Sequence, residues 1–309
     1  MPWPSNSFER IVQGRGEVAA GARSRRRWCA LFVAILLLSS NAVAQEGGAR
    51  AALRVCADPN ILPMSNKAGQ GYENKIAELF GRKLGIPVAY EWFPQRIGFI
   101  RNTLRNNETE DGAYKCDLVM GVTENYDIAA PTRPYLRSSW AMVYVKGRGL
   151  DFIQSQDDLK NISAEQIATL RIGLWDRGPG PDFIHQVGLM EQAIPFQSMS
   201  GDANEYPGKI IERDLVEDKI NLTFVWGPIA GYLAKQIKDP ELKVIPMRGE
   251  PGLRFDFQIA MAVRFGEKAW KAQINALIIE NQDEIDAILD DYGVPRKALI
   301  IRPNIDDDD

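Results

Sequence analysis

Histidine and cysteine are scarce in this chain of 309 residues, which has one histidine and three cysteines. His185 lies in a segment with a helical pattern, and a single imidazole cannot form a multi-histidine metal site. A single histidine also gives little basis for predicting a Ser-His-Asp triad. Cys56 and Cys116 lie sixty residues apart, which is not the C-x-x-C spacing of a redox motif. We therefore expect a protein that is not an enzyme, with no catalytic residues, no metal and no cofactor of its own.

The apolar stretch 28–38 is too short to cross a bilayer, which needs about 20 residues. It follows an arginine cluster that ends at Arg27, and it precedes the small-x-small sequence Ala42-Val43-Ala44. A basic region, a short apolar region and small residues in this order are typical of a secretory signal peptide. We predict that residues 1–44 are removed by cleavage after Ala44. An uncleaved anchor is the alternative.

Basic residues are in deficit, with 37 Lys and Arg against 41 Asp and Glu. Removing the leader takes away six Arg and two Glu, which leaves 31 basic and 39 acidic residues and a net charge of −8. Nucleic-acid binders need basic surface for phosphates, so we expect no nucleic-acid partner. The four aspartates 306–309 are expected to form a solvated acidic tail, together with residues 304–305, rather than a metal clamp.

Only Cys56 and Cys116 remain after the leader is removed. Two cysteines in an oxidising compartment favour one disulfide. However, Cys56 lies near the end of one expected strand and Cys116 near the start of another, and a bridge needs Cα atoms within about 7 Å. Cys56–Cys116 is therefore a candidate disulfide, and the free pair remains the alternative.

Hydrophobic periodicity predicts two blocks of alternating strands and helices. In the first block, strands are expected at 53–57, 87–92 and 116–122, and helices at 72–84 and 97–105. Further strands are expected at 138–146, 170–175, 220–226, 242–247 and 255–264, and further helices at 181–190, 207–217, 228–236 and 270–289. Two such blocks, joined by one strand out and one strand back, predict an α/β protein with two lobes and a cleft between them.

Residues 121–135, GVTENYDIAAPTRPY, follow the third expected strand and are predicted to form a polar loop. Ligands of open α/β sheets bind at the carboxyl ends of the strands. This loop is therefore predicted to line the cleft, and Arg133, Tyr135 and Arg137 are expected to stabilise the crossover between lobes.

Several segments resemble periplasmic solute-binding proteins of the amino-acid-binding type. They are Leu53-Arg54-Val55 running into Asp58-Pro59, Gly71-Tyr72-Glu73-Asn74-Lys75-Ile76-Ala77, and Cys116-Asp117-Leu118-Val119-Met120-Gly121. A further set resembles the branch of this family associated with quinoprotein methanol dehydrogenases (MxaJ/XoxJ-type), with a pattern more like XoxJ. It comprises Cys56-Ala57-Asp58-Pro59-Asn60, Phe93-Pro94-Gln95-Arg96, Arg101-Asn102-Thr103-Leu104, Arg133-Pro134-Tyr135-x-Arg137-Ser138, Ile211-Glu212-Arg213-Asp214-Leu215, Val225-Trp226-Gly227-Pro228-x-Ala230-Gly231 and Arg264-Phe265-Gly266-Glu267-Lys268.

The resemblance implies a two-lobed periplasmic binding protein fold (type II) in the periplasm. Each lobe would be a doubly wound, mostly parallel sheet with flanking helices. The first lobe would be discontinuous, with residues 45–145 and 257–303, and the second would comprise residues 146–256.

Amino-acid binders of this family need an arginine for the α-carboxylate and an acid for the α-ammonium. No guanidinium occurs around Tyr126-Asp127-Ile128, and Trp226 stands where the acid is expected. Burying a zwitterion without partners costs several kcal/mol, so tight amino-acid binding is not expected. The residues predicted to line the cleft for a ligand or partner are Asp58, Ser65, Asn66, Phe93, Gln95, Arg96, Thr123, Tyr126, Asp127, Trp175 and Trp226. For Phe93, Trp175 and Trp226 a place in the core is the alternative, and for Asp58 it is the capping of a turn.

By resemblance, we predict an accessory protein for a pyrroloquinoline-quinone (PQQ)-dependent methanol dehydrogenase of the lanthanide-dependent (XoxF) type. It would assist the activation or maturation of that enzyme through protein–protein interaction, without being embedded in the membrane. The alternative is the solute-binding component of a transporter for a quinone-like or apolar ligand held in the cleft. An enzyme derived from this fold, similar to cyclohexadienyl dehydratase, is a third reading.

Overall fold

The structure is a computed structural model that describes residues 50–109, 112–198, 202 and 204–300. The predicted leader, its cleavage site after Ala44 and the four terminal aspartates lie outside these residues. Within the described ranges, no helix is both long and apolar enough to cross a membrane.

A sheet of nine strands organises the molecule, in the order β4-β1-β5-β11-β6-β9-β7-β8, with β10 paired to β6. Both outer regions are parallel, since β1 pairs in parallel with β4 and β5, and β7 with β8 and β9. The central strands β6, β10 and β11 run antiparallel to their neighbours. The strands are β1 Leu53–Ala57, β4 Val88–Trp92, β5 Leu118–Thr123, β6 Ala130–Val145, β7 Ile172–Trp175, β8 Ala193–Phe196, β9 Leu222–Trp226, β10 Leu242–Pro246 and β11 Asp256–Val263.

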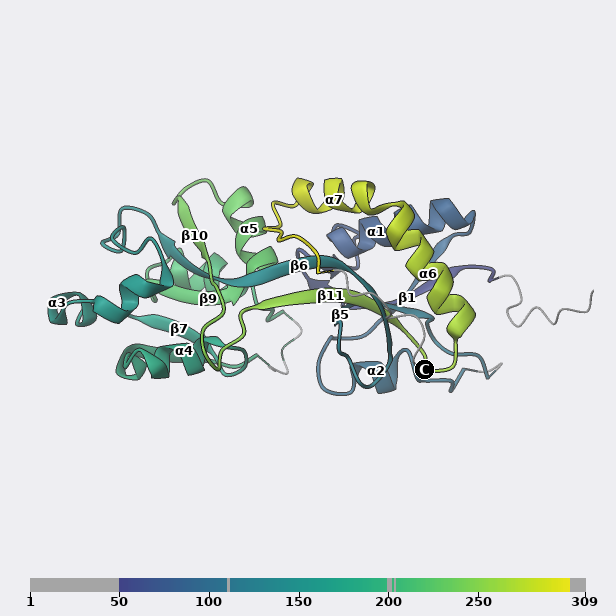
Figure 1. The fold of residues 1–309 in the computed structure, drawn as a ribbon, viewed down its shortest axis with the longest axis horizontal. Coiled ribbons are helices and arrows are strands. Elements are labelled where there is room, and N and C mark those ends of the chain that lie inside the picture. Colours follow the sequence, from purple (N-terminus) through teal and green to yellow (C-terminus); the bar gives the residue numbers. More distant parts are fainter. Residues whose placement is uncertain (1–49, 110–111, 199–201, 203, 301–309) are drawn as a thin grey trace, which may run out of the picture. The chain divides into compact units, whose positions relative to one another are not determined.

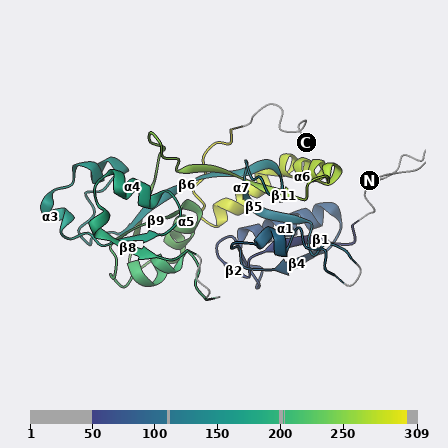
Figure 2. The ribbon, with the colours of Figure 1, turned by 90° about the horizontal axis from the view of Figure 1, so that it is seen from below.

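Helices flank this sheet, and a short hairpin follows β1. The hairpin consists of β2 Asn60–Ile61 and β3 Ser65–Asn66. The helices are α1 Tyr72–Leu84, α2 Phe99–Asn102, α3 Ala164–Ile167, α4 Gly180–Gln186, α5 Gly227–Gln236, α6 Lys268–Glu280 and α7 Gln282–Asp291, with a π-helical segment at Ile210–Leu215. Figure 2 shows α1 beside β1 and β4, and α5 beside β9, in the two halves of the sheet.

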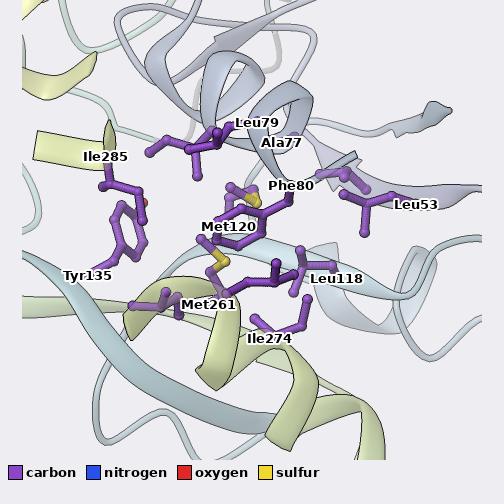
Figure 3. Packing of buried hydrophobic residues seen from close by; sticks show 14 of the residues in the cluster. Leu53, Ala77, Leu79, Phe80, Leu118, Met120, Tyr135, Met261, Ile274 and Ile285 are labelled. Carbon is purple, nitrogen blue, oxygen red and sulfur yellow. The ribbon is translucent and has the colours of Figure 1, made fainter. Parts of the chain in front are cut away.

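Helix α1 illustrates how local sequence builds the first half. Its buried side chains include Ile76, Leu79 and Phe80, which recur on one face at helical spacing. The Asn74 side chain accepts the Gly71 N–H at the start, and Gly85 ends the helix with a φ of 68°. The buried face packs on the sheet, where Phe80 meets Met120 of β5 and Met261 of β11 (Figure 3).

Separate hydrophobic clusters fill the two halves. One extends from Leu53 to Leu136 and resumes from Met261 to Val294, whereas another lies between Met142 and Phe255. Strands β6 and β11 run from one half to the other (Figure 1). This arrangement confirms the predicted α/β fold of the type II periplasmic binding proteins.

The helix predicted at 270–289 is wrong, because two helices occupy this region. Helix α6 ends at Glu280 and α7 begins at Gln282. Between them, the backbone and side-chain N–H groups of Asn281 both donate to the Leu277 carbonyl. An asparagine that bonds the preceding turn in this way competes with helix continuation. The predicted helices at 97–105 and 181–190 are likewise shorter, and the one at 207–217 contains the π-helical segment.

The predicted loop 121–135 is also partly wrong, because β6 already begins at Ala130. Its two prolines, Pro131 and Pro134, lie opposite β11 where the register of the pair shifts. Bulges of this kind tolerate residues without an N–H. The Thr132 hydroxyl accepts a hydrogen bond from the Met261 N–H at 3.0 Å. The segment read as a loop thus forms the start of the crossover strand.

Cys56 and Cys116 form a disulfide with Cα atoms 5.5 Å apart. It links the end of β1 to the residue two positions before β5. Directly beside it, Asp117 anchors an ion network with Arg54 and Arg264 at 2.8 and 2.7 Å. Arg50 joins the same carboxylate at 2.9 Å. The disulfide and this network therefore hold the segment just before β1, two parallel strands and the segment after β11 together.

Candidate functional site

A small pocket lies between the two halves at the carboxyl ends of parallel strands, where open α/β sheets hold ligands. Asp58 follows β1, Gln95 and Arg96 follow β4, and Trp175 ends β7. The pocket encloses about 80 Å³, well below the roughly 300 Å³ at the lower end of small-molecule sites. The residues that line it are Asp58, Pro59, Asn60, Ile61, Pro94, Gln95, Arg96, Trp175, Gln197, Ser198, Glu205, Tyr206 and Pro207.

Asp58 organises the floor of the pocket. One carboxylate oxygen accepts the Asn60 N–H at 2.8 Å, and the other accepts the Gln95 N–H at 2.6 Å. The Gln95 side chain then donates to the Gly121 carbonyl at 3.1 Å. Asp58 therefore caps the turn after β1 and also fixes the loop after β4, so both of its oxygens already have backbone donors.

Trp175 closes the pocket from the second half. Its side chain is buried, with 8% exposure, and packs edge-on against Phe196 with ring centroids 5.8 Å apart. Its indole N–H has no hydrogen-bond partner in the described part of the chain. A buried donor without an acceptor is costly, and this cost marks the N–H as a position that no contact among the described residues explains.

The charged groups that face the pocket are engaged within the protein. Arg96 donates to the Asp202 carbonyl at 3.0 Å, which links the two halves. Glu205 pairs with Arg213 at 3.0 Å. Because Asp58 is bonded to backbone amides as well, the pocket presents no matched cation and anion for an amino-acid zwitterion. Trp226 packs against Phe257 with centroids 6.1 Å apart, and it does not line this pocket.

Other residues predicted for the cleft have structural contacts instead. The Ser65 hydroxyl donates to the Asp58 carbonyl at 2.8 Å. The Asn66 side chain accepts the Gln70 N–H at 2.8 Å and donates to the Gln70 side chain, so it closes the turn after the hairpin. Phe93 packs on the cluster around the disulfide, and Asp127 is exposed on the loop after β5. Of the predicted set, the pocket gathers Asp58, Gln95, Arg96 and Trp175.

A second, larger depression adjoins the pocket on the first half and encloses about 580 Å³. It shares Gln95 and Arg96 with the pocket and includes the predicted residues Thr123 and Tyr126. We call it the α2 groove. Its lining residues are Gln95, Arg96, Ile97, Gly98, Phe99, Ile100, Arg101, Arg105, Val119, Gly121, Val122, Thr123, Tyr126 and Ile128.

Glu73 is a buried acid that sequence analysis missed. It lies in the first turn of α1 with 7% exposure. Burial, and secondarily the charge of Asp58, raises the pKa of Glu73 to about 8. A side chain at Gly121 would place its Cβ 2.6 Å from a Glu73 carboxyl oxygen. An acid in a first helical turn usually faces solvent, so only this tertiary contact with β5 distinguishes Glu73.

The described residues offer little for catalysis. They hold no group of three or more His, Cys, Asp or Glu side chains placed to bind a metal ion. His185 is exposed on α4, away from the residues that line the pocket.

Comparison with known proteins agrees with this architecture, although no protein-family model matches the chain. The crystal structure of the periplasmic binding protein XoxJ from Methylobacterium extorquens AM1 is 30% identical, covers 80% of this chain and 100% of that one, and superposes with a TM-score of 0.63. MxaJ from Methlophaga aminisulfidivorans MPT is 23% identical over 79% of this chain and 100% of its own, with a TM-score of 0.65, and supports the fold.

In sequence, Protein MoxJ from Methylorubrum extorquens is 24% identical over 92% of this chain and 97% of its own length. The relatives match nearly the whole described chain, including both halves of the sheet. The protein therefore belongs to the MxaJ/XoxJ-type family of periplasmic solute-binding proteins.

Proposed function

We propose that this protein is a non-catalytic periplasmic accessory of a PQQ-dependent methanol dehydrogenase of the lanthanide-dependent type. The observation that carries the proposal is the state of the pocket between the two halves. It is small, and its charged side chains are already bonded within the protein. A member of a solute-binding family whose solute site is closed in this way is better suited to binding another protein.

Such a protein acts on the dehydrogenase by favouring one of its states. Binding changes an equilibrium only through different affinities for the two states. We propose that the accessory binds the active or maturing enzyme more tightly than the inactive one, and so raises the active fraction. The PQQ belongs to the dehydrogenase, and this chain supplies no redox group.

Activity of the purified dehydrogenase, measured with and without equimolar accessory protein, tests the proposal. We expect the accessory to raise methanol oxidation or the fraction of enzyme loaded with PQQ. The lanthanide-dependent enzyme should respond more strongly than the calcium-dependent one. No change in activity or loading, together with no complex on gel filtration, would contradict the proposal.

A second candidate function rests on Trp175, which lines the pocket and whose buried indole N–H has no partner among the described residues. A quinone-like ligand carries carbonyl acceptors and a flat apolar ring, which match this donor and its aromatic neighbour Phe196. A ligand that binds only the folded state raises the melting temperature. Stabilisation by a small soluble quinone, without any effect on the dehydrogenase, would favour a transporter component instead.

Export and lobe boundaries are part of the same proposal. We propose that residues 1–44 are removed after Ala44 and that the mature protein is periplasmic. We also propose a first lobe of residues 45–145 with 257–303, and a second of 146–256. The mass of the protein purified from periplasm checks the cleavage, because the predicted mature chain begins at Gln45.

A further inference from the structure

The α2 groove combines an apolar floor with a basic rim. Phe99 and Ile100 of α2 and Val119 and Val122 of β5 line it and are buried. Ile97 and Ile128 also line it, but they are 76% and 44% exposed. Two exposed aliphatic side chains that line one apolar groove differ from the singly scattered ones of ordinary surface.

The charge of the groove is opposite to that of the protein. Arg96, Arg101 and Arg105 line it, and its lining contains no Asp or Glu. Without the predicted leader, the chain has a net charge of −8. Three cations gathered in one groove of an acidic protein create a local positive field, and such a field favours an anionic partner.

The rim arginines are available for such a partner. Arg101 and Arg105 are exposed, and neither side chain has an ion pair or hydrogen bond with the described residues. In contrast, Arg54 and Arg264 of the same half are held by Asp117. Arg54 and Arg264 thus stabilise the fold through ion pairs, whereas Arg101 and Arg105 form no such pair with the described residues.

We infer that the α2 groove docks a segment of the dehydrogenase in which acidic side chains flank an aliphatic or aromatic one. The inference rests on the proposed function and assigns the docking face. The apolar side chain enters the depression of about 580 Å³ beside Ile97 and Ile128. The acids reach Arg101 and Arg105, whose planar guanidinium groups suit carboxylates.

Affinity for the purified dehydrogenase, measured by isothermal titration at low and at physiological salt, tests the docking face. The charge reversal R101E/R105E is expected to weaken binding about ten-fold or more, with the larger effect at low salt. The exposed change I97S is expected to weaken it several-fold at both salt concentrations. The double variant K238E/K243E, on the α5–β10 connection and β10 of the other half, is the matched charge control and should bind like wild type.

The outcomes separate the docking face from the proposed function. If wild-type protein does not bind the dehydrogenase, the proposed function fails. If wild type binds and both R101E/R105E and I97S bind equally well, the function stands and the docking face is overturned. Ile97 is too exposed for I97S to unfold the protein, so this variant remains informative even if the double reversal is unstable.

Two other occupants have their own signatures. The first is the acidic segment 306–309. It would be the occupant if its removal lowers the melting temperature as much as R101E/R105E does, while both variants still bind the dehydrogenase like wild type. A concentration-dependent dimer that R101E/R105E abolishes, again with unchanged binding, would assign the groove to a second copy. Either result would overturn the inference.

Discussion

At the residue scale, Asp117 is the shared anion of three arginines from separate segments. It has 1% exposure and contacts Arg50, Arg54 and Arg264. Burial alone would raise the pKa of Asp117, but hydrogen bonds from Arg54 and Arg264 and the charge of Arg50 lower it. The stabilisation from this ionised acid is present above the ordinary aspartate pKa, and it is lost as pH falls through the lower folded pKa.

Replacing Asp117 by asparagine should therefore be strongly destabilising. D117N keeps the shape of the side chain but removes the carboxylate that Arg50, Arg54 and Arg264 share, and leaves the buried Arg264 with Glu267 as its remaining ion-pair partner. We expect the free energy of unfolding to fall by about 3–5 kcal/mol, as measured by urea denaturation at pH 7. The exposed change D127N is the matched control, and an equal loss in both variants would contradict this role.

Glu73 should give the opposite dependence on pH. Its folded pKa of about 8 lies above the ordinary glutamate value. Between those two values the folded state binds more protons than the unfolded state, so stability falls as pH rises, by up to about 1.4 kcal/mol per unit. E73Q removes this titration, and its stability relative to wild type should therefore increase from pH 5 to pH 8. A constant difference between the two across this range would show that Glu73 does not titrate there.

At the element scale, α5 meets the segment after α7 through close backbone contact. A Cβ at Gly231 would lie 2.1 Å from the Gly293 carbonyl oxygen. Tyr232 stacks on Tyr292 with centroids 6.0 Å apart, and Lys235 donates to the Asp291 carbonyl at 2.6 Å. Helix α5 belongs to the second half and α7 to the first, so this contact joins them.

Substitution of Gly231 by alanine should separate these two segments. We expect G231A to lower the free energy of unfolding by about 1–3 kcal/mol, because a methyl group cannot fit without a backbone shift. At Gly249 an added Cβ finds its nearest atom at 3.7 Å, so G249A is the matched control and should be nearly neutral. Thermal and urea denaturation of both variants measures the difference, and equal stabilities would count against this contact.

Elements with local signals were predictable from the sequence. The bounds of Leu53–Ala57 and Tyr72–Leu84 are as predicted. For the helix, apolar spacing and the flanking glycines carry this information locally. The interruption at Asn281 was not predictable, because asparagine is compatible with a helix and its effect depends on buried hydrogen bonds to Leu277. The start of β6 at Ala130 was missed because Pro131 and Pro134 argue against a strand in the sequence. Only the bulged pairing with β11 accommodates them.

The candidate site was predictable only in part, for a related reason. Asp58, Gln95, Arg96 and Trp175 follow or end expected strands, and these positions meet at one edge of the sheet. Gln197 and Tyr206 do not lie at the end of an expected strand. Their place in the pocket depends on how the second half packs against the first, which the sequence does not indicate. The α2 groove depends on two segments about thirty residues apart in sequence, around Ile97 and Ile128, which only the folded chain brings together.

At the scale of the whole molecule, the fold of a solute-binding protein is retained while its solute pocket is small and internally bonded. The positive α2 groove beside it is about seven times larger in volume, with 580 against 80 Å³. In a protein whose net charge is otherwise negative, this groove is the surface that we propose for a macromolecular partner. The two features together favour an accessory protein over a transporter component.

Capture of tagged protein from the periplasm of methanol-grown cells tests this account most directly. The captured proteins are identified by mass spectrometry, and the eluted dehydrogenase is assayed for methanol oxidation and PQQ content. We predict that a PQQ-dependent methanol dehydrogenase is recovered with the wild-type protein, and in much smaller amount with R101E/R105E. Recovery of no dehydrogenase by the wild-type protein, from cells that contain the enzyme, would contradict the account.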